Sequence, residues 1–193
     1  MSYWTKEEFN KFLDCVMNKH TSVVGFSLLF WLGLRLGEMM ALYPSDFNFE
    51  KSTVSITKTY SQQFGILDPK TDNSRRVLKV PPFLLELVKE YIDRIYGIDM
   101  NDRLFQVGKN YWEYEFQRGI NSSGVKKIRI HDLRHSFAAM CCSNNIPMKI
   151  LSELLGHAEI NSTMIYAHFY PNKKDEVIDF LQQQYDEGQR CQD

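Results

Sequence analysis

Several segments of the sequence place side chains that can bind an anion or move a proton among apolar neighbours. Burying a charge without a partner is costly, so an arginine in such a segment must be paired or must face an anion. The residues concerned are Arg35 in FWLGLRLGEMMAL (30–42), Lys70 in PKTDNSRRVLKVP (69–81), His131, Arg134 and His135 in RIHDLRHSFA (129–138), and His157 and Tyr166 in LLGHAEINSTMIYAH (154–168).

Each of these residues, taken alone, has an ordinary structural explanation. Arg35 is about one helical turn from Glu38, and an Arg–Glu pair at this spacing is a common local contact. His157 lies just past an expected helix end, where a histidine usually caps the helix or faces solvent. Tyr166 lies at an apolar position that suits a core tyrosine, and Lys70 lies beside a turn, where lysines are usually solvated.

His131 and His135 lie four residues apart, the spacing of two zinc ligands in H-E-x-x-H hydrolases. The position after the first histidine is Asp132 instead of glutamate, Arg134 would place a cation beside the metal, and no acidic third ligand lies nearby. The sequence therefore disfavours a zinc hydrolase and predicts no metal site. His135 is interpreted as a core histidine with a local hydrogen bond.

Together, the same residues suit chemistry on a phosphodiester. Arginines and histidines can hold the phosphate, a lysine can act as general acid, and a tyrosine can be the nucleophile. With a phenol pKa near ~10, ionising a tyrosine at pH 7 costs roughly 4 kcal/mol. One preorganised donor to a developing oxyanion contributes ~2.7–4 kcal/mol. Several cations around one phosphate can therefore contribute enough stabilisation to offset the cost of ionising the tyrosine.

The N-terminal part of the chain predicts helices. Thr5-Lys-Glu-Glu8 has the form of a capping box and precedes apolar residues at helical spacing, so a first helix is expected there. Thr21 or Ser22 is expected to cap a second, buried helix that ends near Gly33. A third helix is expected to start near Arg35 and to stop before the proline at position 44.

The apolar pattern then alternates. STVSITKTY (52–60) and RRVLKV (75–80) predict a small antiparallel sheet with Lys70 at or beside a turn. Helical spacing returns afterwards, and further helices are expected over about 84–95, 109–119, the segment of HDLRHSFA, 147–155, 161–169 and the acidic tail. The chain is therefore predicted to be an α+β protein, mainly α, with a helical bundle and one small antiparallel sheet.

The charge of the chain is close to balanced but unevenly distributed. The net charge is −1. Residues 175–193 hold six acidic residues and one basic residue, which leaves 22 basic and 18 acidic residues in the remainder. Two basic clusters are Lys70, Arg75, Arg76 and Lys79, and Lys126, Lys127, Arg129 and Arg134. Such clusters are usually solvated surface, so alone they support nucleic-acid binding only weakly.

The cellular compartment is predicted from what the sequence lacks. The spacing of the four cysteines suggests neither a disulfide framework nor a zinc knuckle, and no cleavable signal is visible at the N-terminus. The strongly apolar stretch 22–34 is too short to span a bilayer. The sequence therefore predicts a cytoplasmic protein that does not contact membranes.

The motifs quoted above resemble the tyrosine recombinase (phage integrase) family in residue type, order and spacing, over essentially the whole chain. HxxRH followed by LLGH and a tyrosine nine residues later is highly specific as a set. WTKEEFNKFL (4–13) and YWEYEFQR (111–118) look most like integrases of Gram-positive phages and conjugative transposons. The resemblance implies a site-specific DNA recombinase that integrates and excises a mobile element.

The resemblance also implies roles for the residues that would hold the phosphate. Arg35 and Arg134 would grip its non-bridging oxygens, and His157 would donate a hydrogen bond to it. Glu38 is interpreted as a residue that orients the first active-site helix. The basic residues expected to contact DNA outside the site are Arg75, Arg76, Lys126, Lys127 and Arg129.

Three further residues would carry the transfer itself. Tyr166 would attack phosphorus and form a 3′-phosphotyrosyl bond. His131 would assist proton transfer at the tyrosine and contact the phosphate, while Lys70 on a β-hairpin would protonate the departing 5′-oxygen. The new linkage conserves the phosphoester, so the resemblance implies neither ATP, nor a metal, nor any other cofactor.

The same resemblance implies a domain organisation and partners. Residues 1–173 would form the catalytic domain and 174–193 an acidic tail helix, while the N-terminal arm-binding and core-binding domains of full-length members are expected to be absent. Double-stranded DNA would be bound weakly by this part alone. Four protomers would assemble in a synapse on DNA, and the C-terminal helix would dock on a neighbouring protomer or fold back in cis.

Two rival interpretations stay open. The first is a DNA-binding module that kept this fold and lost the chemistry, although all six expected catalytic residues are present. The second is the zinc hydrolase, which predicts stoichiometric metal.

Overall fold

The computed structural model describes residues 2–69, 74–95, 97–157 and 159–171. Its elements in chain order are α1 (Lys6–Asp14), α2 (His20–Leu32), α3 (Leu36–Met40), η1 (Pro44–Asp46), β1 (Phe47–Asn48), β2 (Thr53–Ile56), β3 (Thr59–Ser61), β4 (Gly65–Leu67), β5 (Arg76–Lys79), α4 (Pro82–Arg94), α5 (Lys109–Ser123), α6 (Asp132–Ser143), α7 (Met148–Leu155), η3 (Ile160–Ser162) and η4 (Met164–Phe169). The predicted class, α+β and mainly α, is confirmed, with two small antiparallel sheets where one was expected.

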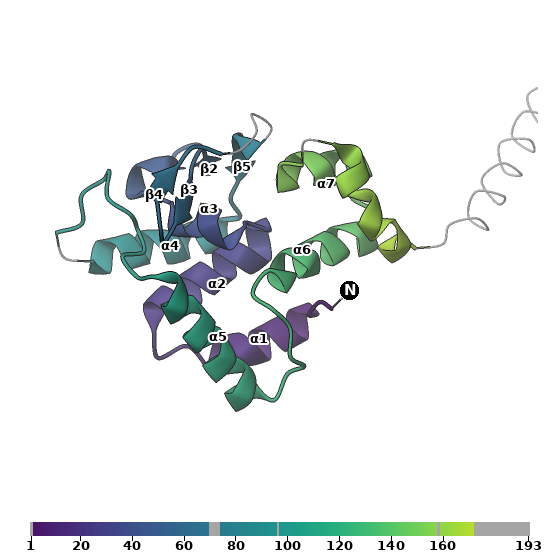
Figure 1. Ribbon diagram of the computed structural model, residues 1–193, viewed down its shortest axis with the longest axis horizontal. Helices are drawn as coiled ribbons and strands as arrows, with labels where there is room; N and C mark the ends of the chain where they lie inside the picture. The colour runs from purple at the N-terminus through teal and green to yellow at the C-terminus, as the bar shows by residue number, and fades with distance from the viewer. Residues whose placement is uncertain (1, 70–73, 96, 158, 172–193) are drawn as a thin grey trace, which may run out of the picture.

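The main hydrophobic core surrounds α2. This helix is apolar around its whole circumference, so it is stable only when other elements cover it. Phe9 of α1 stacks on Phe30 with ring centroids 4.0 Å apart, and Trp112 of α5 meets Phe26 edge-on at 5.5 Å. Figure 1 shows α1 and α5 on one side of α2, with α4 and the sheets on the other.

None of the helices in the described segments is long and apolar enough to cross a membrane.

The strands form two antiparallel sheets with the orders β1-β2-β5 and β3-β4. The single strand expected over 52–60 is instead interrupted at Thr57 and Lys58, so β3 leaves the first sheet and pairs with β4. Lys58 is one reason for the interruption, because its ammonium turns to the carboxylate of Asp46, 2.6 Å away. Lys70, expected at or beside a turn, lies outside the described residues.

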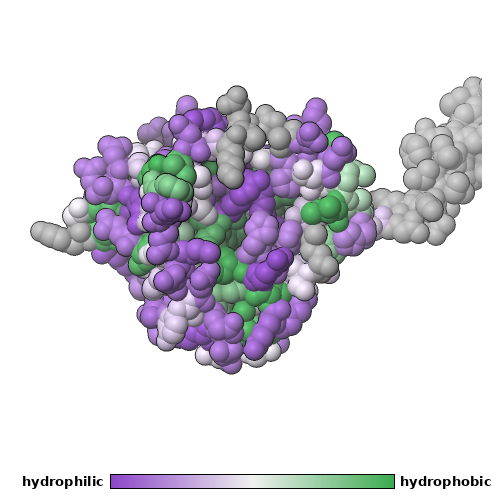
Figure 2. Space-filling view, in the orientation of Figure 1, coloured by the Kyte–Doolittle hydropathy of each residue, from purple (hydrophilic) through white to green (hydrophobic). Residues whose placement is uncertain are grey.

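The C-terminal half adds a second, smaller hydrophobic cluster. Helix α6 packs on α2 and continues to α7 and η4 (Figure 1). The side chains of this cluster are Phe137, Ala138, Cys142, Leu151, Leu155 and Tyr166. The face of the molecule in Figure 2 is mostly hydrophilic, with hydrophobic residues visible near its centre. The cluster contains Tyr166, the residue that the resemblance implies as the nucleophile.

Several element boundaries differ from those predicted. Helix α2 begins at His20, two or three residues earlier than expected, because Thr21 and Ser22 do not cap it. Their hydroxyls hydrogen-bond to Tyr91 and Tyr111, at 3.0 and 2.9 Å, and so tie α2 to α4 and α5. The helix expected over 161–169 consists of two 3-10 turns, η3 and η4. In contrast, the capping box of Thr5 and Glu8 is present as predicted.

The close approach of α2 and α5 yields a stability prediction. A Cβ added at Gly25 would lie 2.2 Å from Cη2 of Trp112, a fully buried ring. We expect Gly25→Ala to lower the free energy of unfolding by about 1–3 kcal/mol through overpacking, despite the better helix propensity of alanine. Denaturant unfolding of both proteins measures this difference.

The matched control is Gly108→Ser, at the start of α5. A Cβ there meets no atom within 4 Å, and serine is a good N-cap residue, so a change of no more than about 0.5 kcal/mol is expected. Equal stability of Gly25→Ala and the parent chain would contradict the close packing described.

Candidate active site

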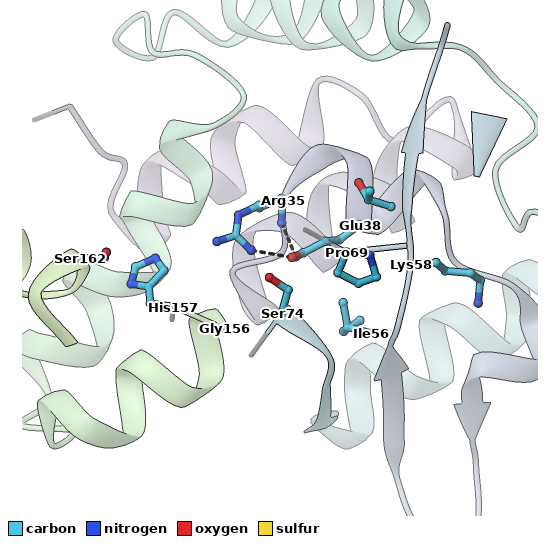
Figure 3. A pocket seen from close by; sticks show the side chains of 10 residues that line it. Arg35, Glu38, Ile56, Lys58, Pro69, Ser74, Gly156, His157 and Ser162 are labelled. Carbon is cyan, nitrogen blue, oxygen red and sulfur yellow. Dashed lines mark hydrogen bonds and ion pairs between the residues drawn. The ribbon is translucent and has the colours of Figure 1, made fainter. Parts of the chain in front are cut away.

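A cavity of about 460 Å³ lies between the sheets and the C-terminal half of the chain. Arg35 and Glu38 line it from the start of α3, and His157 lines it from the segment after α7 (Figure 3). Pro69 and Ser74 also line it, and these residues flank the segment that carries Lys70. Lys70 itself lies outside the described residues.

Glu38 organises the arginines on one side of the cavity. As the third residue of α3 it reaches back to the backbone N–H of Arg35 at 2.9 Å, and Nη1 of Arg35 donates to its other oxygen at 2.7 Å. Arg76 donates to both oxygens, at 3.1 and 2.9 Å. Burial raises the pKa of Glu38, but hydrogen bonds and charge from the two arginines outweigh this and lower it. The expected orienting role of Glu38 matches this placement.

Arg76 is placed differently from the DNA-facing role expected for it. Its side chain is only 7% exposed, and besides Glu38 it donates to the backbone carbonyls of Leu154 and Ser74. A guanidinium with these partners is not free to contact a DNA backbone. Its neighbour Arg75 points outward and pairs with Asp68 at 2.6 Å.

Arg134 is buried in α6 with 2% exposure. Its Nη1 donates to the carbonyl of Gly33 at 2.7 Å and its Nη2 to that of Leu155 at 2.6 Å. No carboxylate of the described residues lies within ion-pair distance of it. Burial, followed by the charge of Arg35, lowers the pKa of Arg134 to about 9. The two arginines therefore lie close enough to repel each other, and an anion between them would relieve that repulsion.

The two predicted phosphate-binding histidines lie near these arginines. Nδ1 of His157 is 2.8 Å from Oγ1 of Thr163, and burial together with the charges of Arg134 and Arg35 lowers the pKa of His157 to about 4. Partial removal of the imidazole from water, followed by the charge of Arg134, lowers the pKa of His131 as well. Both imidazoles are therefore neutral at neutral pH, and each can donate one hydrogen bond without adding to the positive charge.

Tyr166 lies in η4 with 1% exposure, packed against Phe137 and Leu155 in the smaller cluster. Burial raises the pKa of the phenol, whereas the charges of Arg134 and Arg35 act to lower it. The hydroxyl is thus within electrostatic reach of both arginines. The structure brings together five of the predicted residues in this way: Arg35, His131, Arg134, His157 and Tyr166.

The sequence analysis missed the contact that His135 makes in this site. Its Nδ1 is 2.7 Å from the hydroxyl of Tyr166, so its hydrogen bond spans 31 residues of chain instead of being local. The signal available in the sequence was its spacing: His131 and His135 lie one turn apart on a helix that also carries Arg134. That spacing is shared by pairs of zinc ligands, and it does not by itself indicate a contact with a distant tyrosine.

The remaining basic residues expected to contact DNA lie on the surface. Arg129 is 78% exposed although it pairs with Asp132, Lys126 lies over the ring of Tyr3 with Nζ 5.1 Å from the ring centroid, and Lys127 is exposed.

Within the described segments, no three His, Cys, Asp or Glu side chains gather where they could hold a metal ion. The zinc-hydrolase alternative therefore has no candidate ligand set in that part of the chain.

Comparison with known proteins gives a consistent result. A family model described as the phage integrase family matches residues 3–173. The ICEBs1 integrase of Bacillus subtilis is 30% identical over 94% of this chain and 54% of its own length. A XerC-like tyrosine recombinase of Caldanaerobacter subterraneus subsp. tengcongensis is 28% identical over 92% of this chain and 53% of its own. The chain spans about half the length of these relatives.

Solved structures show the same fold. The Tn1549 transposon integrase in complex with circular intermediate DNA aligns with a TM-score of 0.77 at 18% identity, over 94% of this chain and 66% of that one. The catalytic domain of bacteriophage HP1 integrase aligns with a TM-score of 0.69 at 19% identity, over 93% of this chain and 95% of that one.

The buried guanidinium leads to a stability prediction. We expect Arg134→Ala to lower the free energy of unfolding by about 2–5 kcal/mol, because it leaves the carbonyls of Gly33 and Leu155 unpaired in the interior. Arg134→Lys should recover only part of this loss, because a single ammonium does not reproduce the two diverging N–H donors of a guanidinium. Denaturant unfolding measures both. An unchanged stability of Arg134→Ala would show that these carbonyls reach water.

The charge around His157 leads to a titration prediction. NMR should report a pKa near 4 for this imidazole, and Arg35→Gln should move it upward toward 6.5 by removing one neighbouring charge. Because this folded-state pKa lies below the ordinary value, the unfolded chain binds the proton first. The contribution of His157 to stability is therefore complete above about pH 6.5 and declines as the pH falls toward 4.

Arg94→Gln is the matched control, since Arg94 lies at the end of α4 and contacts His20 instead. It should leave the pKa of His157 unchanged. A normal pKa for His157 in the parent chain would show that the arginines do not surround this side chain.

Proposed function

The chain belongs to the phage integrase family, and from this membership we propose that it is the catalytic part of a tyrosine recombinase that cuts and rejoins DNA to integrate or excise a mobile element. The observation that carries the proposal is the site itself. Arg35 lines the cavity, the buried Arg134 lies close enough to Arg35 for their charges to repel, and the charges of both act on the phenol of Tyr166. The carboxylate next to Arg35, Glu38, is already shared with Arg76. Such a site binds an anion and suits a phosphodiester.

In the proposed reaction the phosphate is held between Arg35 and Arg134, with a hydrogen bond from His157. The hydroxyl oxygen of Tyr166 attacks phosphorus, the bond from phosphorus to the 5′-oxygen breaks, and the departing oxygen takes a proton from Lys70. His131 contacts the phosphate and assists proton transfer. One phosphoester replaces another, so attack by a DNA 5′-hydroxyl reverses the step and rejoins the strand without a separate energy source.

The proposal extends to the wider assembly. Residues 1–173 would be the catalytic domain and 174–193 a tail helix that docks on a neighbouring protomer, within a four-protomer synapse on double-stranded DNA in the cytoplasm. The exposed bases Arg75, Lys126, Lys127 and Arg129 would contact the DNA backbone. A near-neutral net charge supports weak DNA affinity for this part alone.

Trapping of a covalent adduct tests the proposal. The 193-residue chain is incubated at high concentration with a library of nicked duplexes, randomised around the nick, in which the cut fragment diffuses away and the adduct persists. We expect a protein–DNA band that is absent for Tyr166→Phe. Arg35→Gln should form the adduct about 10²–10³-fold more slowly, because it removes a donor to the developing negative charge.

The same assay separates the rival interpretation. A DNA-binding module that has lost the chemistry would retard the duplexes in a gel and give no adduct. That outcome would refute the enzymatic proposal for this chain.

A further inference from the structure

The hydroxyl of Tyr166 faces an imidazole that the proposed reaction does not yet use. Oη of Tyr166 and Nδ1 of His135 are 2.7 Å apart, which is the distance of a good hydrogen bond. Both groups are largely removed from water, with the tyrosine 1% exposed and the side chain of His135 12% exposed. The contact joins η4 to α6 and lies at the atom that would attack phosphorus.

The surroundings of His135 decide which of its nitrogens carries the proton. Its Nε2 lies 3.8 Å from Oδ1 of Asp132, which is too far for a direct hydrogen bond but close enough for the charge to orient the ring. Asp132 is ionised, because hydrogen bonds from Arg129 lower its pKa against the opposing effect of burial. A negative charge facing Nε2 favours the proton on that nitrogen, which leaves the lone pair of Nδ1 facing the phenol.

His135 is also in the protonation state that can accept a proton, the neutral imidazole. Desolvation, followed by the charge of His131, lowers the pKa of His135, while Asp132 raises it. The other charged groups that act on it are Arg129 and Arg134, and from η4 it faces the phenol of Tyr166. The imidazole is therefore neutral at neutral pH, with an empty proton site directed at the hydroxyl.

We propose that His135 is the general base that takes the proton from Tyr166 during attack on phosphorus, with Asp132 as the residue that orients it. The inference rests on the proposed function. As the bond from Oη to phosphorus forms and the bond to the 5′-oxygen breaks, the phenolic proton moves to Nδ1, and the leaving oxygen takes its proton from Lys70. In the rejoining step the imidazolium returns the proton to Oη. The carboxylate of Asp132 stabilises this imidazolium while the adduct exists.

This assignment divides the work between two histidines of α6. The rings of His131 and His135 meet edge-on with centroids 5.1 Å apart, and His131 lies at the N-terminal end of the helix, exposed. In this assignment His131 keeps the expected contact with the phosphate, whereas proton transfer at the tyrosine, also expected of His131, is carried out by His135. A positioned general base contributes about 10²–10⁴-fold to a rate, so the contact is large enough to measure.

The first test needs no DNA. Nitrogen-15 NMR of the free 193-residue chain reports which nitrogen of each imidazole is protonated. We expect Nε2 of His135 to carry the proton and Nδ1 to be a bare acceptor. A proton on Nδ1 of the neutral ring would overturn the inference, whatever the chain does to DNA.

The second test uses His135→Asn on a duplex selected from the nicked library. The amide oxygen of asparagine can take the place of Nδ1 and accept the phenolic hydrogen bond, but it cannot bind a proton. We expect adduct formation to slow by about 100-fold or more. The wild-type rate should be flat above the imidazole pKa and fall below it, whereas the His135→Asn rate should keep rising with pH toward the pKa of the phenol.

The matched control is His20→Asn, at an exposed histidine that contacts Arg94 far from the site. It should keep the wild-type rate and pH profile. If His135→Asn keeps the wild-type rate, or is slower with an unchanged pH profile, then His135 only positions the tyrosine and the inference is wrong. Absence of any adduct from the wild-type chain would instead refute the proposed function.

Discussion

The site depends on one buried cation. Arg134 donates to the carbonyls of Gly33 and Leu155, which lie at the C-terminal ends of α2 and α7. These are carbonyls that no helical N–H satisfies, at the negative ends of two helix dipoles, and each helix is closed by a glycine in the left-handed conformation. The partial negative charges of these carbonyls therefore hold the guanidinium, and no carboxylate of the described residues pairs with it. Its full positive charge stays available to a ligand, and the same two bonds join the two hydrophobic clusters.

The other charges are arranged around that constraint. Glu38 is the one carboxylate that binds the arginines of this site among the described residues, and it is shared between Arg35 and Arg76. The site therefore keeps an excess of positive charge, which also keeps His157 neutral. Arg76 serves this arrangement from the inside, since it fixes the carboxylate that fixes Arg35. Arg76 therefore acts on the position of Arg35 through Glu38.

Local signals in the sequence predicted much of this fold, and tertiary contacts explain the rest. The capping box at Thr5 forms because its partners lie within one turn, whereas Thr21 and Ser22 fail as caps because their hydroxyls find tyrosines from distant helices. Arg76 was predictable in principle: strict alternation in RRVLKV puts it on the same face as the buried Leu78. His135 was not, because its partner Tyr166 lies in another element and only the folded chain brings the two together.

Tyr166, the proposed nucleophile, lies in the smaller of two hydrophobic clusters, apart from the aromatic core around α2. Regions with fewer buried contacts open more often than the rest of a native protein. Local opening of α7 and η4 would detach the tyrosine from both its arginines and its histidine, while the scaffold persists. Under the proposed function, heat or denaturant would therefore abolish the chemistry before the core around α2 unfolds.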